Sequence, residues 1–70
     1  MDVRRILGAN VRKAREQRGW SQEELADRSG IHRTYVSGVE RGARNPTIKI
    51  IAAIAVALEL PIVTLVEGAP

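Results

Sequence analysis

The chain has 70 residues, of which 44% are hydrophobic but only 3% are aromatic, with one histidine and no cysteine. Such a length supports a single domain, residues 1–70, with a modest core, and the lack of cysteine excludes disulfides and cysteine-ligated zinc. The formal net charge is +3, and six of the eleven basic residues lie in the first twenty positions, which favours a polyanionic partner on one face.

The sequence also argues against a membrane-spanning or secreted protein. No apolar run approaches the roughly 20 residues that a spanning helix needs. Arg4 and Arg5 lead into an amphipathic segment rather than into the apolar segment of a signal peptide. We therefore expect a cytoplasmic protein.

Residues 3–18 are predicted to form a first helix. Apolar residues recur at helical spacing from Val3 to Ala14 and would form one buried stripe. Gly8 lies inside this helix, where glycine is about 1 kcal/mol less favourable than alanine. The glycine therefore suggests that the backbone of a neighbouring helix comes close, and Gly19 is expected to end the helix.

The stretch 21–41 is predicted to form two short helices joined by a tight turn. Ser21 and Glu24 fit the S-x-x-E capping box, in which each side chain caps the backbone of the other. Gly30 would end the first helix, because glycine adopts a positive φ without steric strain. A second helix is predicted over about 33–41, and the pair forms a helix-turn-helix.

The C-terminal third is predicted to begin with a loop and continue as a nearly wholly apolar helix. Pro46 disfavours helix at the residue before it, and Thr47 is a suitable N-cap for a helix over 48–58. A helix that is apolar nearly all round is buried on more than one side. The segment that follows has β-like local propensity, although Pro61 suits the first turn of a helix.

An ordered set of residues runs through most of the chain: Leu7, Gly8, Val11, Arg12, Arg15, Ser21, Gln22, Leu25, Ala26, Gly30, Ile31, Val36, Glu40, Arg41, Gly42, Asn45, Pro46, Ile54, Ala55 and Leu58. This set resembles the phage-repressor/Cro-like (Xre-type) helix-turn-helix family over roughly residues 5–67. The segment His32-Arg33-Thr34-Tyr35 also resembles controller proteins of restriction–modification systems.

The resemblance implies an all-α fold, a compact five-helix bundle of the lambda-repressor-like kind with a central helix-turn-helix. It implies a short fifth helix after Pro61 in spite of the local propensity. Helices four and five, over about 47–66, would serve as scaffold and dimerisation surface.

The resemblance also implies that the N-terminal end of the second motif helix enters the major groove of DNA. The family's base-contacting positions fall on Arg33, Thr34, Ser37 and Gly38. Arg33 is the strongest candidate, because its planar fork matches O6 and N7 of guanine. Gly38 departs from the family by having no side chain. His32 is a poor N-cap, so we expect it to contact a base or a phosphate instead.

Phosphate contacts are expected to flank that helix, from side chains that can donate hydrogen bonds or supply positive charge. The alternative for each of them is ordinary solvation. The candidates are Gln22, Tyr35, Arg41, Arg44 and Arg15. The resemblance further pairs Arg15 with Glu40, so that the first helix would be tied to the end of the recognition helix.

Several apolar residues exceed what a small five-helix core needs, and large exposed apolar patches usually mark interfaces. They are Ile50, Val56, Ile62, Val63 and Val66. We predict a homodimer through these residues; a monomer with an apolar surface is the alternative. A two-fold dimer would read a roughly palindromic operator with recognition helices about 34 Å apart.

Together these inferences predict a sequence-specific, double-stranded DNA-binding transcriptional regulator, such as a repressor, associated with the nucleoid. Activation would add RNA polymerase as a partner. The sequence offers no enzyme signature, no metal-ligand set and no cofactor motif, and the lone histidine does not suggest a metal site. The alternative is an antitoxin or a protein-interaction adaptor that uses the apolar C-terminal face.

Overall fold

Five α-helices account for most of the computed structural model, which describes residues 2–68. They are α1 (Val3–Gln17), α2 (Gln22–Ser29), α3 (Arg33–Glu40), α4 (Ile48–Leu58) and α5 (Ile62–Leu65). The predicted all-α class and the short fifth helix are confirmed. Among the described helices, none has the length and hydropathy that a membrane crossing requires.

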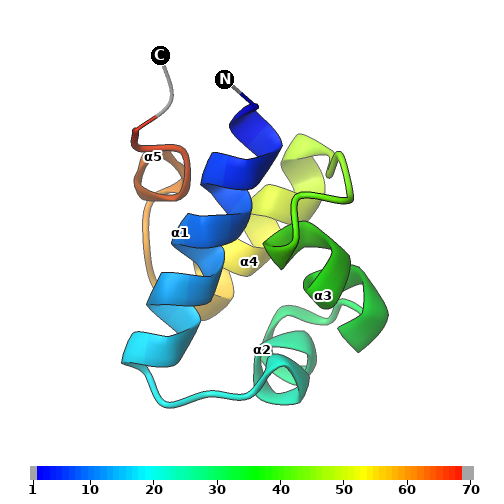
Figure 1. The fold of residues 1–70 in the computed structure, drawn as a ribbon. Helices are drawn as coiled ribbons and strands as arrows, with labels where there is room; N and C mark the ends of the chain where they lie inside the picture. Colours follow the sequence, from blue (N-terminus) through cyan, green and yellow to red (C-terminus); the bar gives the residue numbers. More distant parts are fainter. Residues whose placement is uncertain (1, 69–70) are drawn as a thin grey trace.

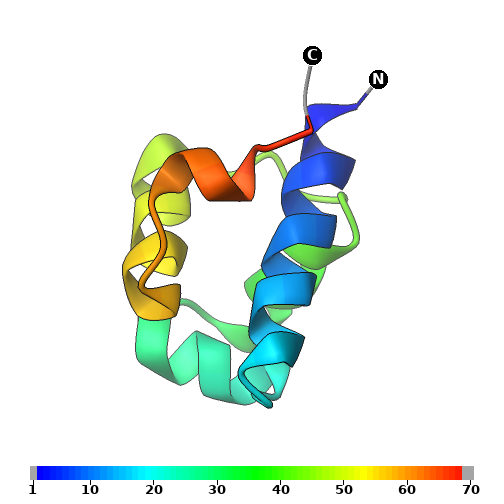
Figure 2. The same cartoon turned by 90° about the vertical axis from the view of Figure 1, so that its left-hand side faces the viewer.

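The helices surround one core. α3 packs against both α1 and α2, α2 packs against α4, and α5 packs against α1 and α4 (Figure 1). The second view places α1 and α4 on opposite sides of the molecule, with α5 at one end and α2 at the other (Figure 2). α3 is therefore supported by two helices on its inner side, and its outer side faces away from the core.

The core is built almost wholly from aliphatic side chains. Its buried members are Leu7, Val11, Ala14, Leu25, Ala26, Val36, Val39, Ile54, Ala55, Leu58 and Leu65. Ile51 of α4 is only half-buried, whereas Leu65 of α5 is fully buried. α5 thus contributes to the core as well as covering it.

The helix ends follow local sequence chemistry. The Ser21 hydroxyl accepts from the backbone N–H of Glu24 at 3.0 Å, and Thr47 caps α4 through the N–H of Ile50 at 3.3 Å. The reciprocal half of the predicted capping box is corrected, because the Glu24 carboxylate instead accepts from Arg28 at 2.9 Å. That pair joins residues four apart on the exposed side of α2, where a carboxylate and a guanidinium meet readily.

Gly8 explains how closely α1 and α3 approach. A Cβ at this position would lie 2.4 Å from the carbonyl oxygen of Val39 and 2.6 Å from that of Glu40. No larger residue fits without moving one of the helices. The glycine therefore sets the position of the C-terminal end of α3.

Candidate nucleic-acid interface

The N-terminal turn of α3 projects outward from the molecule. His32, Arg33 and Thr34 are exposed, whereas Val36 and Val39 on the opposite side of the helix are buried. The alternation follows from the apolar stripe of an amphipathic helix, which turns its polar side to solvent. The side chains expected to read bases thus lie on the open side of α3.

His32 has a different place from the one expected. Its Nδ1 accepts a hydrogen bond from the backbone N–H of Thr34 at 3.2 Å, and the Thr34 hydroxyl is also in contact with this ring nitrogen. The histidine therefore is the N-cap of α3, although a poor cap was expected at this position, and its contact with DNA stays a prediction. The cap also holds the Thr34 hydroxyl close to the helix terminus.

Arg33 lies next to this cap and is exposed. It belongs to none of the four ion pairs formed within residues 2–68. Its guanidinium is therefore accessible at the point where α3 begins. Ser37, one turn later, is half-buried.

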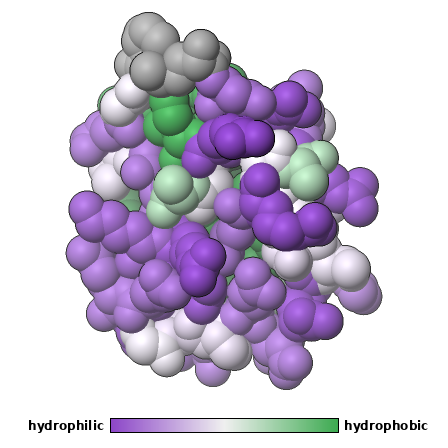
Figure 3. Space-filling model, in the orientation of Figure 1, coloured by the Kyte–Doolittle hydropathy of each residue, from purple (hydrophilic) through white to green (hydrophobic). Residues whose placement is uncertain are grey.

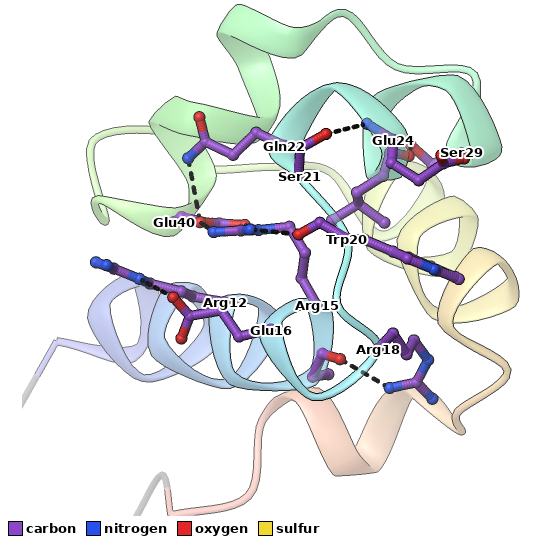
Figure 4. Close-up of polar contacts among 12 residues, drawn as sticks. Arg12, Arg15, Glu16, Arg18, Trp20, Ser21, Gln22, Glu24, Ser29 and Glu40 are labelled. Atoms are coloured by element: carbon purple, nitrogen blue, oxygen red, sulfur yellow. Dashed lines mark hydrogen bonds and ion pairs between the residues drawn. The ribbon is translucent and has the colours of Figure 1, made fainter.

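The C-terminal end of α3 is fixed by a buried ion pair. Arg15 donates from Nε to Oε2 of Glu40 at 2.7 Å and from Nη2 to Oε1 at 3.0 Å, and its Nη1 donates to the Trp20 carbonyl at 2.7 Å. Gln22 adds a bond from Nε2 to Oε1 of Glu40 at 3.2 Å (Figure 4). The side chains of Arg15 and Glu40 are only 11% and 3% exposed. The Glu40 carboxylate thus joins α1, α2 and α3, and the Arg15 guanidinium adds the α1–α2 turn through Trp20.

The same geometry accounts for the chemistry of Arg15. The hydrogen bonds to Glu40 raise the pKa of the Arg15 guanidinium above its ordinary value, so the group is charged at any pH the protein meets. The buried guanidinium is used on Glu40 and on the Trp20 carbonyl, so the Arg15–Glu40 pair that was predicted is present in the structure. The Arg15–phosphate contact stays a prediction.

Gly38 lies beneath a side chain of the loop after α3. It is buried, and a Cβ there would lie 2.6 Å from Cγ of Arg44. The Arg44 side chain covers this position, and its guanidinium carbon lies 5.2 Å from the centre of the Tyr35 ring. The Arg44 side chain of the loop after α3 thus covers the backbone at Gly38, and the base contact predicted there stays a prediction.

The remaining phosphate candidates lie around α3. Arg41 and Arg44 are exposed, and Gln22 and Tyr35 are half-buried. The structure brings Gln22 to Glu40 and Arg44 to Tyr35. In the orientation of Figure 1 the surface is mostly hydrophilic, with a smaller hydrophobic area towards the end where α1 begins (Figure 3).

Sequence reasoning missed two arrangements around the aromatic residues. The contact of Arg44 with Gly38 and Tyr35 is one of them. The other is at Trp20, where the guanidinium carbon of Arg28 lies 4.2 Å from the ring centroid and that of Arg18 lies 5.8 Å away. No spacing rule marks these pairs, since they depend on how turns fold back on helices.

The predicted dimer residues divide into two groups. Val56 of α4 and Val63 of α5 are 77% and 61% exposed. Ile50, Ile62 and Val66 are half-buried and pack against the core, so the expectation that they are surplus to it is wrong. Their exposed parts and the two valines still leave apolar surface on α4 and α5.

A hollow of about 260 Å³ lies away from α3. Side chains of α1 and of the segment around α5 line it, among them Asn10, Lys13, Arg18 and Thr64. Within residues 2–68 no three histidine, cysteine or acidic residues gather as a metal site would require.

Comparison with known proteins places these features in a family. Residues 11–65 match the family model described as helix-turn-helix. The chain is 48% identical over 58 residues to the control protein C.SmaI of Serratia marcescens, covering 83% of this chain and 69% of that one.

Two solved structures of controller proteins are also similar. The restriction–modification controller protein C.AhdI from Aeromonas hydrophila is 42% identical, with a TM-score of 0.86 over 89% of this chain and 94% of that one. The controller protein C.Esp1396I, as a tetramer with its natural 35 base-pair operator, is 37% identical, with a TM-score of 0.86 over 96% of this chain and 88% of that one. On sequence and fold together, the chain belongs to the helix-turn-helix family of regulators related to the restriction–modification controller proteins.

Proposed function

We propose that this protein regulates transcription by binding a specific double-stranded operator through α3. The observation that carries the proposal is that the N-terminal turn of α3 is exposed while its C-terminal end is held in place. His32, Arg33 and Thr34 are exposed, while the Arg15–Glu40 pair anchors the other end of the helix. A rigid helix with outward polar side chains is what readout in the major groove requires.

Arg33 and Thr34 are the proposed base readers, with Ser37 behind them. Arg33 would donate two hydrogen bonds to guanine, and Thr34 would offer its methyl to thymine or its hydroxyl to a base edge. Gln22, Tyr35, Arg41 and Arg44 would bind phosphates on either side. Gln22 keeps a second amide hydrogen for this purpose after its bond to Glu40.

We further propose that the chain acts as a homodimer through α4 and α5. Exposed Val56 and Val63 would form the centre of the interface, extended by the outer parts of Ile50, Ile62 and Val66. A two-fold dimer presents two copies of α3 to a roughly palindromic site, and linking two half-sites raises affinity. The C.Esp1396I relative binds its operator as a tetramer, which is consistent with assembly of such dimers.

The proposed activity is binding without catalysis, in the cytoplasm and at the nucleoid where operator DNA lies. The relatives are regulators and controller proteins, which favours a regulator over the antitoxin or adaptor alternative. A restriction–modification system is accordingly the first place to look for regulated genes. Repression needs only occupancy of the operator, whereas activation would need a contact with RNA polymerase.

Selection of bound duplexes from a random DNA pool tests the proposal. A regulator of this kind should enrich one site with two symmetric half-sites. Affinity for that site should fall steeply with salt, at a slope of about −0.9 per neutralised phosphate. Recovery of no preferred sequence, together with a flat salt dependence, would instead support a protein-interaction adaptor.

A further inference from the structure

The backbone carbonyl of Gly38 holds the loop after α3 against the helix. Its carbonyl oxygen accepts hydrogen bonds from the backbone N–H groups of Ala43 at 2.9 Å and Arg44 at 3.3 Å. The chain therefore folds back over α3 at this residue and delivers the Arg44 side chain to it.

The missing side chain of Gly38 is what leaves room for Arg44. A Cβ at Gly38 would lie 2.6 Å from Cγ, 3.1 Å from Nε and 3.4 Å from Cδ of Arg44. Carbon atoms cannot approach to 2.6 Å without a shift. The methylene chain of Arg44 thus lies in the space that any other residue at position 38 would occupy.

Tyr35 completes the arrangement from the preceding turn of α3. The centre of its ring lies 5.2 Å from the guanidinium carbon of Arg44, a distance at which a cation is attracted to the ring face. Arg44 nevertheless remains exposed, and it takes part in none of the ion pairs formed within residues 2–68. Its charge is held in place but is not neutralised.

We propose that Gly38 and Tyr35 are positioning residues that hold Arg44 beside α3, ready for a DNA phosphate at the edge of the major groove. The inference rests on the proposed function of α3 as the recognition helix. A long flexible side chain loses rotamer freedom when a partner immobilises it, and ordering it beforehand reduces that loss. Gly38 would then affect DNA affinity without touching DNA.

The substitution Gly38→Ala tests this role, because its effects on stability and on binding should differ. Alanine favours helix over glycine, and Arg44 can swing into solvent, so the midpoint of thermal unfolding should not fall. Affinity for the selected operator should fall about fivefold, the scale of one exposed cation–π contact. The salt slope should become shallower by about one, as for any lost phosphate contact.

A double-mutant cycle shows whether Gly38 acts through Arg44. Arg44→Ala alone should reproduce the loss, and Gly38→Ala should add nothing in the Arg44→Ala background. Unchanged affinity and slope in Gly38→Ala would overturn the proposal. An equal loss in both backgrounds would also overturn it, because the glycine would then act through α3 itself.

Two variants at Tyr35 give an independent test that does not depend on Gly38→Ala folding. Tyr35→Phe keeps the ring under the guanidinium, so the Arg44→Ala penalty should persist in that background. Tyr35→Leu removes the ring, and the penalty should shrink. An undiminished penalty in Tyr35→Leu would contradict the positioning role. Failure of the wild-type protein to prefer any DNA sequence would instead defeat the proposed function itself.

Discussion

At the scale of single residues, one carboxylate ties the C-terminal end of α3 to the neighbouring helices. Glu40 accepts from Arg15 and from Gln22, and it lies almost wholly out of solvent. A paired charge of this kind adds little net stability by itself, but a partner left alone in the interior is strongly destabilising. The main effect of the Arg15–Glu40 pair is therefore to position α3 relative to α1 and α2.

Glu40→Gln should lower the free energy of unfolding by about 3 kcal/mol, because it leaves the buried Arg15 charge without its counter-ion. Glu16→Gln is a matched control. Glu16 pairs with Arg12 at 3.3 Å with both side chains more than half exposed. Removing such a surface pair should change the free energy by less than about 1 kcal/mol. Urea titrations of the two variants measure the difference, and similar values for both would contradict the assigned role of Glu40.

Arg33 is the residue on which sequence preference should depend. Arg33→Ala should weaken operator binding by about 1–3 kcal/mol and relax preference at one base pair in each half-site. Lys13→Ala, which removes the same charge from the hollow away from α3, should leave the preference unchanged. Competition binding with single base-pair variants of the operator measures the preference at each position. Intact preference in Arg33→Ala would mean that α3 is not the reading element.

At the scale of elements, α1 and α3 approach each other closely at Gly8. Gly8 allows this approach, and its neighbours Leu7 and Val11 complete the buried stripe of α1. Helix propensity alone would favour alanine at position 8, so the preference for glycine must come from the contact.

Gly8→Ala should therefore destabilise the fold, although alanine is the better helix former by about 1 kcal/mol. The new Cβ would meet the carbonyl oxygens of Val39 and Glu40, and backbone atoms cannot swing aside as a side chain can. We expect a loss of about 1–3 kcal/mol, the range for overpacking. Ala9→Gly, at an exposed position of the same turn, calibrates the propensity effect. A rise in the thermal midpoint of Gly8→Ala would show that the two helices are not packed so closely.

The elements also show which parts of the structure were predictable. Thr47 after Pro46 fixed the start of α4, and the predicted bounds of that helix agree with Ile48–Leu58. These features are local, so they are visible in sequence. Leu65 was not identified as a core residue, because the segment around it is apolar almost throughout. The segment therefore has too few polar residues to indicate which of its sides faces the core.

The candidate site was less predictable than the fold, because several of its contacts are not local in sequence. The outward position of Arg33 follows from the stripe of α3. The contact between Arg44 and Gly38 depends on how the loop after α3 folds back over the helix. The hydrophobic periodicity of the sequence does not encode that path. The sequence analysis also missed the role of His32 as an N-cap, because imidazole is rare in that role. The structure shows that its Nδ1 faces the backbone N–H of Thr34.

At the scale of the whole molecule, α3 and the exposed valines of α4 and α5 lie on different elements. The surfaces proposed for DNA binding and for dimerisation can therefore be tested by separate mutations. A chain of this size buries only about 60% of its unfolded surface, so association would also add stability.

Val56→Glu should shift the protein from dimer to monomer at tens of micromolar, because it would bury charge in an apolar interface. Folding should be preserved, since Val56 is already 77% exposed within one chain. Operator affinity should fall because linkage of the half-sites is lost. Val3→Glu, at an exposed valine of α1, is the control and should remain dimeric. Sedimentation velocity distinguishes the two, and a monomeric wild-type protein would refute the dimer.

The sole tryptophan gives a practical consequence of the α1–α2 turn. Its indole lies under the Arg28 guanidinium, and its carbonyl is held by the buried Arg15. Nearby cations and partial burial perturb indole fluorescence, so its emission reports whether this junction is intact. Unfolding of every variant above can thus be followed optically at low concentration, without an attached dye and without disturbing the surface offered to DNA.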